Sequence, residues 1–385
     1  MPSVVPFRDT DRSMDPPALT ATVPAEPEDA PLLAPVTRDL SWAAIHGMSQ
    51  QLVRGPHGAR AIMDIRRTAT IRTGARMIKL LTPRQVSAYL FGRRPNGFCY
   101  RSSDLTDLRG ADLAMLLGDT TYPGLHTEGE VFGLRWRAVH PSDYEIPFAV
   151  DDGDVRGYGG LGEISPHHRV GPPVLGTGFA PSQHHLIPEF VTTDLADLPV
   201  PAGASLVAFA PDGTEISLYL YVPEQRAWTR MFGPQHRHLV AGIPEISTEQ
   251  EYVQMSVDHS GGSALIGQYA GRTYEALADP PHEYRVLARA RAARYPVESV
   301  ARRIRSAQWH GIVCTVVRVE GDWLRLRLCR PDRDIAAMSG AQVVERAIYE
   351  VWAPASEVGR VHDIDVAYPL TLPEAPTQDP QWTSD

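Results

Sequence analysis

Two runs of apolar residues in the middle of the chain flank a tight-turn signal. Residues 206–210 and 216–222 are rich in β-prone side chains, and the tetrapeptide PDGT at 211–214 separates them. Asp-Gly readily supplies the positive φ angles that a tight turn needs. The pattern therefore predicts that the two runs pair as an antiparallel hairpin.

The second of these runs alternates between two faces. Leu218 and Leu220 fall on one face, whereas Tyr219 and Tyr221 fall on the other. Such alternation is typical of a half-buried strand. It predicts an aromatic outer face, which Trp228 extends from a third strand.

Local signals for helices and strands also occur on both sides of this hairpin. Thr82-Pro83 places a capping residue and a proline where a short helix through residue 90 should begin. Residues 131–139 alternate as a strand does. Strands are also predicted, near the C-terminal end, at 312–319, 323–328 and 343–352.

Residues 283–308 carry seven arginines against two glutamates. The spacing of apolar positions predicts a helix that is interrupted near Pro296. On an unbroken helix Arg285, Arg289 and Arg303 would share one face. Such a face is commonly solvated, but it is also suited to an acidic partner.

These patterns predict an α+β protein of two or three modules with mostly antiparallel sheets, ending in a small SH3-like or split β-barrel. The expected organisation is a disordered, proline-rich acidic tail at 1–36, an N-terminal α+β domain at 37–173, a central β-rich domain at 174–282, an arginine-rich helical connector at 283–308, a small β-barrel-like module at 309–370 and a disordered tail at 371–385. The glycine-rich stretch at 151–173 should be a loop over a site or a domain connection.

Composition narrows the functional classes. The 385 residues carry a formal net charge of −9, which argues against general nucleic-acid binding, because that needs an extended basic surface. Cys99, Cys314 and Cys329 have neither metal-ligand spacing nor an even number for disulfides. No apolar run approaches the roughly 18 residues of a membrane span, and the first residues lack a signal-peptide core. We expect a cytoplasmic protein without membrane or nucleic-acid partners.

Standard catalytic and metal motifs are absent from the sequence. There is no Walker loop, Rossmann glycine fingerprint, HExxH, CxxC pair or GxSxG elbow. Histidines cluster at 167–168, at 184–185 and at His236 and His238, and one from each cluster with Glu189 would make a sensible zinc set. Loop histidines are more often polar surface or hydrogen-bonded core groups, so we expect no bound metal.

Four separated residues resemble, in order, the arginine, serine and glutamate elements of ADP-ribosyltransferases. They are Arg101, Ser182, Glu249 and Glu251. The resemblance implies that Arg101 holds the NAD phosphates, Ser182 braces the nicotinamide half and Glu251 stabilises the oxocarbenium ion. The Ser-Thr-Ser core of that family is missing. An NAD-consuming transferase or glycohydrolase is therefore the alternative hypothesis.

Three longer phrases resemble a large actinobacterial family without an assigned activity. They are GTGFAPSQHHLIPEFVTTDLADLPVPAGASL, YVPEQRAWTRMFGP and ARYPVESVARRIRSAQWHGIVCTVVRVEGDWLRLRLCRPD. Some members of that family are encoded near type VII secretion toxin loci. The resemblance implies a secretion-linked or toxin-linked context, and it supplies no catalytic residues.

The main prediction is a non-catalytic accessory protein that binds a protein partner without a cofactor. The lack of any complete catalytic constellation in the sequence motivates it. Two surfaces are the expected contacts, one basic and one aromatic. Their residues are Arg285, Arg289, Arg302, Arg303 and Arg305 on the first, and Tyr219, Tyr221 and Trp228 on the second.

Overall fold

The fold is seen in a computed structural model, which describes residues 69–106, 108, 113, 116–117, 131–145, 179–181, 186–210, 212–255, 262–281, 283–288, 293–329, 338–345 and 348–370. Several predictions fall outside these ranges. They concern the tails at 1–36 and 371–385, the stretch at 151–173, the histidines at 167–168 and 184–185, and the candidate residues Ser182 and Arg289.

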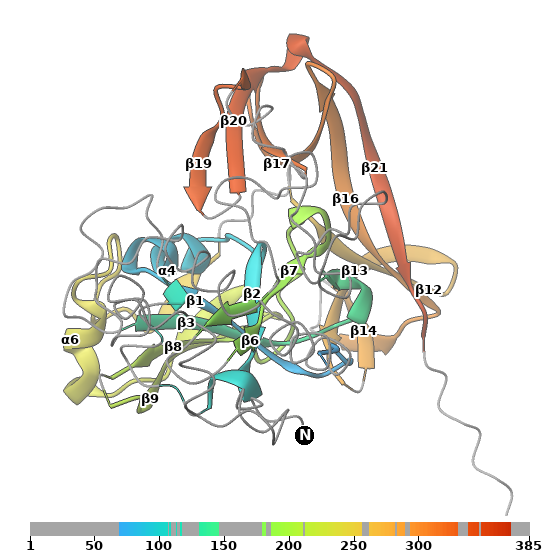
Figure 1. The fold of residues 1–385 in the computed structure, drawn as a ribbon. Coiled ribbons are helices and arrows are strands. Elements are labelled where there is room, and N and C mark those ends of the chain that lie inside the picture. The colour runs from blue at the N-terminus through green and yellow to red at the C-terminus, as the bar shows by residue number, and fades with distance from the viewer. Residues whose placement is uncertain are drawn as a thin grey trace, which may run out of the picture.

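A nine-stranded antiparallel sheet, in the order β11-β10-β9-β8-β3-β1-β2-β7-β4, forms the lower body of the described residues (Figure 1). Its strands are β1 (Arg76–Leu81), β2 (Phe98–Arg101), β3 (Val131–Arg137), β4 (Tyr144–Glu145), β7 (Phe190–Thr192), β8 (Ser205–Phe209), β9 (Glu215–Val222), β10 (Ala227–Arg230) and β11 (Tyr252–Gln254). Beside it, β5 (Phe179–Pro181) pairs with β6 (Leu186–Pro188). Because β3 pairs with β8, the boundary expected at residue 173 does not separate two sheets.

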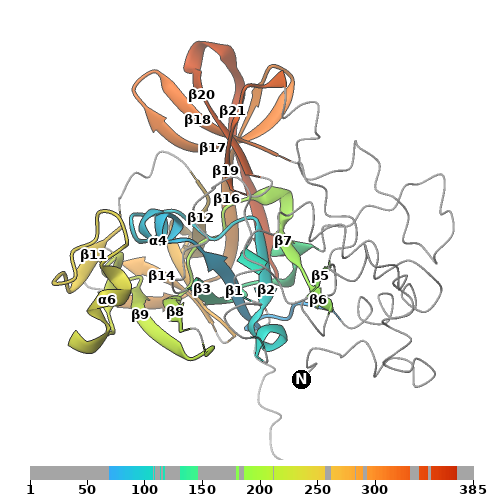
Figure 2. The ribbon, with the colours of Figure 1, turned by 60° about the vertical axis from the view of Figure 1, so that its left-hand side comes forward.

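A second, ten-stranded sheet of the described residues follows the order β15-β14-β13-β12-β16-β17-β18-β20-β19, with β21 paired to β16. Its strands are β12 (Ala264–Tyr269), β13 (Arg272–Asp279), β14 (Glu283–Ala288), β15 (Ala293–Pro296), β16 (Ser299–Trp309), β17 (Ile312–Glu320), β18 (Trp323–Leu328), β19 (Gln342–Glu345), β20 (Ile348–Pro354) and β21 (Val358–Tyr368). Figure 2 shows β17, β18 and β20 rising above the body that holds α4, β1 and β3.

The predicted α+β class is wrong, because the regular secondary structure of the described residues consists mostly of antiparallel strands. The prediction of a separate C-terminal barrel is also wrong, because the C-terminal strands belong to the ten-stranded sheet. The strands predicted at 312–319 and 323–328 are present as β17 and β18, whereas the single strand predicted at 343–352 is wrong, because β19 and β20 occupy that segment and pair with each other. All four strands continue the open ten-stranded sheet through β16. This strand pairs with β12 at its start, with β17 at its end and with β21 along most of its length.

The arginine-rich helix expected at 283–308 is wrong as well. The described residues of this segment form β14, β15 and β16 instead. Alanine and arginine favour helices when local propensity decides, but long-range pairing overrides that preference here. Arg303 lies opposite Asp365, and Arg305 lies opposite Asp363, across the β16–β21 ladder.

The central hairpin is confirmed, whereas its predicted faces are wrong. β8 and β9 pair antiparallel, and Gly213 has the positive φ of a turn residue. The ladder pairs Leu206 with Tyr219 but Val207 with Ser217, so Leu218 is an extra residue in a β-bulge. The bulge reverses the alternation beyond it, and Tyr219 is consequently buried.

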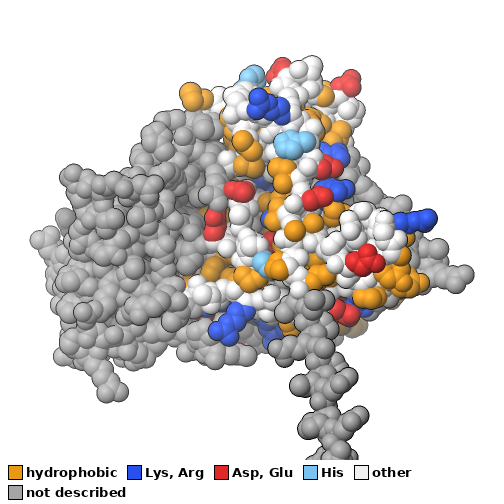
Figure 3. Space-filling view, turned by 90° about the vertical axis from the view of Figure 1, so that its right-hand side faces the viewer, with side chains coloured by type: hydrophobic (Ala, Val, Ile, Leu, Met, Phe, Trp, Pro, Cys, Tyr) orange, Lys and Arg blue, Asp and Glu red, His pale blue; other side chains and the backbone are white. Residues whose placement is uncertain are grey.

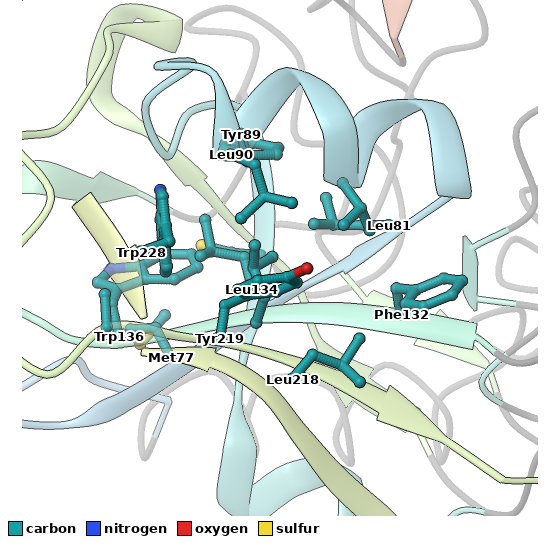
Figure 4. Close-up of a cluster of buried hydrophobic side chains, with 14 of the residues drawn as sticks. Met77, Leu81, Tyr89, Leu90, Phe132, Leu134, Trp136, Leu218, Tyr219 and Trp228 are labelled. Atoms are coloured by element: carbon teal, nitrogen blue, oxygen red, sulfur yellow. The ribbon is translucent and has the colours of Figure 1, made fainter. Parts of the chain in front are cut away.

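The short helices of the described residues are α4 (Pro83–Leu90) and α6 (Arg237–Val240). The predicted cap of α4 is confirmed: Gln85 N donates to Thr82 Oγ1, and Thr82 N donates to Gln85 Oε1. Tyr89 and Leu90 point from α4 into a buried cluster that contains Trp228 and Tyr219 (Figure 4). The 3₁₀ turns are Ser102–Leu105, Pro141–Asp143, Thr193–Leu195, Pro234–His236 and Ala355–Glu357. No helix in the described residues has the length and apolar character to span a membrane.

Candidate binding cleft

Arg101 is buried at the end of β2 and is engaged by its neighbours. Its Nε donates to Asp104 Oδ2 at 2.7 Å, and its Nη2 donates to Asp104 Oδ1 at 3.1 Å. Its Nη1 donates to the Thr70 carbonyl at 3.3 Å, and its guanidinium carbon lies 5.6 Å from the centre of the Phe190 ring. This guanidinium therefore holds the local fold together and is not presented to a ligand.

Glu249 and Glu251 lie at the opposite edge of the same sheet. Glu249 pairs with Arg237 at 2.8 Å, and Glu251 lies 3.7 Å from Arg230. Both precede β11, which is six ladder steps from β2, and each step is about 4.8 Å, so roughly 30 Å of sheet lies between them. The structure does not bring Arg101 together with either glutamate.

The described residues give no support to the zinc-site hypothesis. Within them, no group of three or more His, Cys, Asp or Glu side chains is arranged to hold a metal ion. The rings of His236 and His238 have centres 6.4 Å apart. Glu189 is buried and accepts a hydrogen bond of 2.9 Å from Tyr100 Oη.

Four of the seven described residues of the two predicted contact surfaces are buried. Tyr219 and Trp228 lie inside the core of the first sheet. Arg285 and Arg302 are also buried, each beside carboxylates of its own. These ion pairs join Arg285 to Asp279 and Glu283, and Arg302 to Asp143. The aromatic and arginine faces expected from the sequence are thus partly internal.

Tyr221, Arg303 and Arg305 instead border a cleft between the two sheets. The cavity measures about 880 Å³. Ligand sites typically occupy roughly 300–1,000 Å³. Its walls come from the segment after α4, from β9, from β12 and β13, and from β16, β17, β18 and β20. Segments far apart in the sequence therefore meet around one space.

Eight arginines line this cleft. They are Arg93, Arg94, Arg226, Arg303, Arg305, Arg318, Arg325 and Arg327. Seven of them lie within ion-pair distance of a carboxylate in the described residues. Most of the positive charge of the cleft is therefore compensated by the protein itself.

Buried ion pairs at the base of the cleft tie β18 to the first half of the chain. Arg327 pairs with Glu350 at 3.0 Å and also with Asp197, while Asn96 Nδ2 donates to Asp197 Oδ1 at 2.7 Å. Burial alone would raise the pKa of Glu350, but Arg327 and neighbouring arginines outweigh it and lower that pKa. Glu350 is consequently held in its charged form.

A second buried group ties β19 to β1. Glu345 Oε1 lies 3.1 Å from Lys79 Nζ and 3.3 Å from Arg93 Nη2. Burial pushes the pKa of Glu345 upward, but Arg93 and Lys79 together outweigh this effect and hold the pKa below its usual range. For Lys79 the effect of burial prevails over Glu345, and its pKa is lowered. These pairs fix the two sheets relative to each other and so fix the walls of the cleft.

Arg94 is the exception among the eight arginines. It makes no ion pair or hydrogen bond with the described residues, and its Nη1 is buried without an acceptor. Burial lowers the pKa of Arg94, and the nearby Asp197 carboxylate only partly offsets this effect. A buried donor without a partner costs about 1–3 kcal/mol, and more when it is charged. An acceptor that reached Arg94 would therefore be bound favourably.

Apolar and aromatic side chains form another part of the wall. Phe91 follows α4, Tyr221 lies on β9, Met255 follows β11 and Leu265 lies on β12. Burial raises the pKa of Tyr221 to about 12, so its phenol stays neutral. The Tyr221 ring centre lies 5.3 Å from that of Trp228, which anchors it to the core. The cleft can therefore hold an apolar group beside a charged one.

Comparisons with family models, with curated proteins and with solved structures found no match for this sequence. The resemblance to an actinobacterial family stays a prediction.

Sequence reasoning found the outer arginines of the cleft and missed the inner ones. Arg93 and Arg94 stand in FGRRPNG, directly after the predicted helix. A glycine before them and a proline after them mark a shaped loop, not a solvated helix face. This local signal was available, but it does not show that β12 and β18 pack against the same loop.

Proposed function

We propose that this protein is a non-catalytic accessory protein that holds an acidic segment of a protein partner in the cleft between its sheets. The observation that carries the proposal is a cavity of about 880 Å³ with eight arginines, one of them without a partner in the described residues. Tyr221, Arg303 and Arg305, which the sequence predicts as contacts, border it. Because the other seven arginines have carboxylate partners, the support comes mainly from Arg94, whose charge favours an acidic group.

The NAD-consuming alternative has no comparable support. Arg101 already donates to Asp104, and Glu249 and Glu251 belong to the other edge of the sheet.

Cytoplasmic residence and a link to a secretion or toxin system belong to the same proposal. Their support comes from the sequence alone, through the resemblance and the lack of long apolar runs. Neither a cofactor nor nucleic acid is needed for the proposed role.

Two labelled peptide libraries that differ only in charge test the proposal. One is rich in Glu, and the other carries Gln at the same positions. Fluorescence anisotropy should show binding of the Glu library and little binding of the Gln library. Arg303→Glu should weaken binding of the Glu library about tenfold or more, because it reverses a charge at the rim of the cleft.

Arg272→Glu is the matched control, since Arg272 is an exposed arginine of β13 that does not line the cleft. It makes the same charge change in the same sheet. Equal binding of the two libraries would contradict the proposal. So would an equal loss in the two variants, which would indicate unspecific attraction.

A further inference from the structure

Arg94 and Asp197 face the same small space beside Gly262. A Cβ atom added to Gly262 would lie 3.5 Å from Arg94 Nη1 and 3.6 Å from Asp197 Oδ2. Gly262 has a φ of +84°, which L side chains rarely adopt. Without a Cβ at Gly262, one further heavy atom fits beside Arg94 Nη1, a donor that solvent does not reach.

The surroundings of Arg94 favour a single negative charge. The other arginines of the cleft have carboxylate partners, whereas Arg94 has none within the part of the chain that the structure describes. Asp197 borders the same space and would repel any anion there, a doubly charged group more strongly than a carboxylate. A planar guanidinium also matches a carboxylate through two parallel hydrogen bonds.

We propose that Arg94 binds a carboxylate of the bound segment, with the adjoining apolar part packed against Phe91, Tyr221 and Met255. This inference rests on the proposed function, because it names the group that the cleft recognises. The carboxylate belongs either to an Asp or Glu residue of the segment or to its C-terminus, since both present the same planar group. Its oxygens accept the hydrogen bonds that Arg94 does not make with the described residues.

Arg94→Met is the first test, because it removes the charge and keeps an unbranched side chain. Binding of the Glu library should fall roughly 10- to 100-fold, the value of a lost hydrogen bond to a charged group. The midpoint of urea unfolding without peptide should stay the same or rise, because a buried charge without a partner has been replaced by an apolar group. A purely structural arginine would give the opposite result, with a lower midpoint and unchanged binding.

Gly262→Ala and Gly311→Ala form a second, matched test. Gly262 and Gly311 have φ values of +84° and +82°, so both substitutions impose the same backbone strain. Nothing lies within 4 Å of a Cβ at Gly311, whereas a Cβ at Gly262 enters the space beside Arg94. Both variants should lose similar stability, and only Gly262→Ala should weaken peptide binding. Equal binding by the two variants would overturn the placement of the carboxylate.

Competition assays identify the group. Benzoate should displace the Glu library, while benzamide and inorganic phosphate at the same concentration should not. Peptides with amidated C-termini separate side-chain carboxylates, which would still bind, from a C-terminal carboxylate, which would not. Phosphate that competes as well as benzoate would overturn the carboxylate assignment. Unchanged binding by Arg94→Met would overturn this inference alone, whereas equal binding of the Glu and Gln libraries would also overturn the proposed function.

Discussion

Arginine–carboxylate pairs occur in two regions of this protein that differ in their exposure to solvent. On the ribbon of β16 and β21, Arg303 donates two hydrogen bonds of 2.7 Å to Asp365, and Arg305 donates one of 3.0 Å to Asp363. Acidic and basic side chains lie beside one another on this side of the molecule (Figure 3). The Arg303 and Asp365 side chains are 39% and 42% exposed.

At the base of the cleft, the same residue types are enclosed. The Arg327 and Glu350 side chains are only 3% and 6% exposed, and Glu345 is equally buried beside Lys79. An exposed pair is worth about 0–1 kcal/mol, whereas removing one partner of a buried pair costs about 3–5 kcal/mol. The comparison teaches that the arginine content of a segment does not reveal what its charges do. Their partners and their burial decide it.

The largest contrast is expected between two neighbours on β16, Arg302 and Arg303. Arg302 is buried, and its Nε lies 3.2 Å from Asp143 Oδ1, which also accepts a hydrogen bond from Tyr368 Oη. Arg302→Glu would place two carboxylates together in the interior and should cost about 3–5 kcal/mol or more. Arg303→Glu should cost about 1 kcal/mol or less, because solvent screens the new like-charge pair. Urea unfolding of the two variants measures the difference, and equal midpoints would refute it.

A smaller effect is expected when a carboxylate is neutralised without a change of shape. Glu345→Gln leaves Lys79 and Arg93 without their shared buried partner and should cost about 3–5 kcal/mol at neutral pH. Asp365→Asn, the control on the exposed ribbon, should cost about 1 kcal/mol or less. The unfolding free energies of both variants in low and high salt test this. A Glu345→Gln variant as stable as Asp365→Asn would remove the distinction between the two regions.

Local patterns in the sequence predict single elements well. The PDGT turn predicts the hairpin of β8 and β9, and Thr82-Pro83 predicts the start of α4. In both cases the deciding interactions join residues a few positions apart. Such interactions are visible in a sequence, because the residues that make them stand close together in it.

Interactions between distant residues are not predictable in this way. The segment around Arg303 and Arg305 has a helical pattern, because its alanines and arginines favour a helix locally. The deciding partners, Asp363 and Asp365, stand about sixty residues later, at the same two-residue spacing. Two arginines and two aspartates at the same spacing are compatible with paired strands. This compatibility can be recognised only when the two segments are known to lie side by side.

The cleft shows the same limit at a larger scale. The alternation places Tyr221 on an outer face, because nothing in it announces the bulge at Leu218. The glycine and proline that flank Arg93 and Arg94 mark a loop, but they do not single out Arg94, because its environment is made by Asp197, Gly262 and strands of the other sheet. A site whose residues come from so many segments has no motif of its own. Only the arrangement in space identifies it.

The smallest expected effect is the dependence on pH of the stability that the buried Glu345 contributes. The folded pKa of Glu345 is lowered, so the unfolded state, with a pKa near 4.3, takes up this proton first as the pH falls. The stability that Glu345 contributes is complete above about pH 4.3 and is lost as the pH falls through its lowered folded pKa. Burial raises the folded pKa values of Asp104 and Asp143, and these two groups therefore change stability with pH in the opposite direction.

The difference in unfolding free energy between wild type and Glu345→Gln isolates the contribution of Glu345 from these other groups. That difference, measured by urea unfolding from about pH 6 to pH 3, should shrink towards low pH. A constant difference would show that Glu345 is not held charged by Arg93 and Lys79.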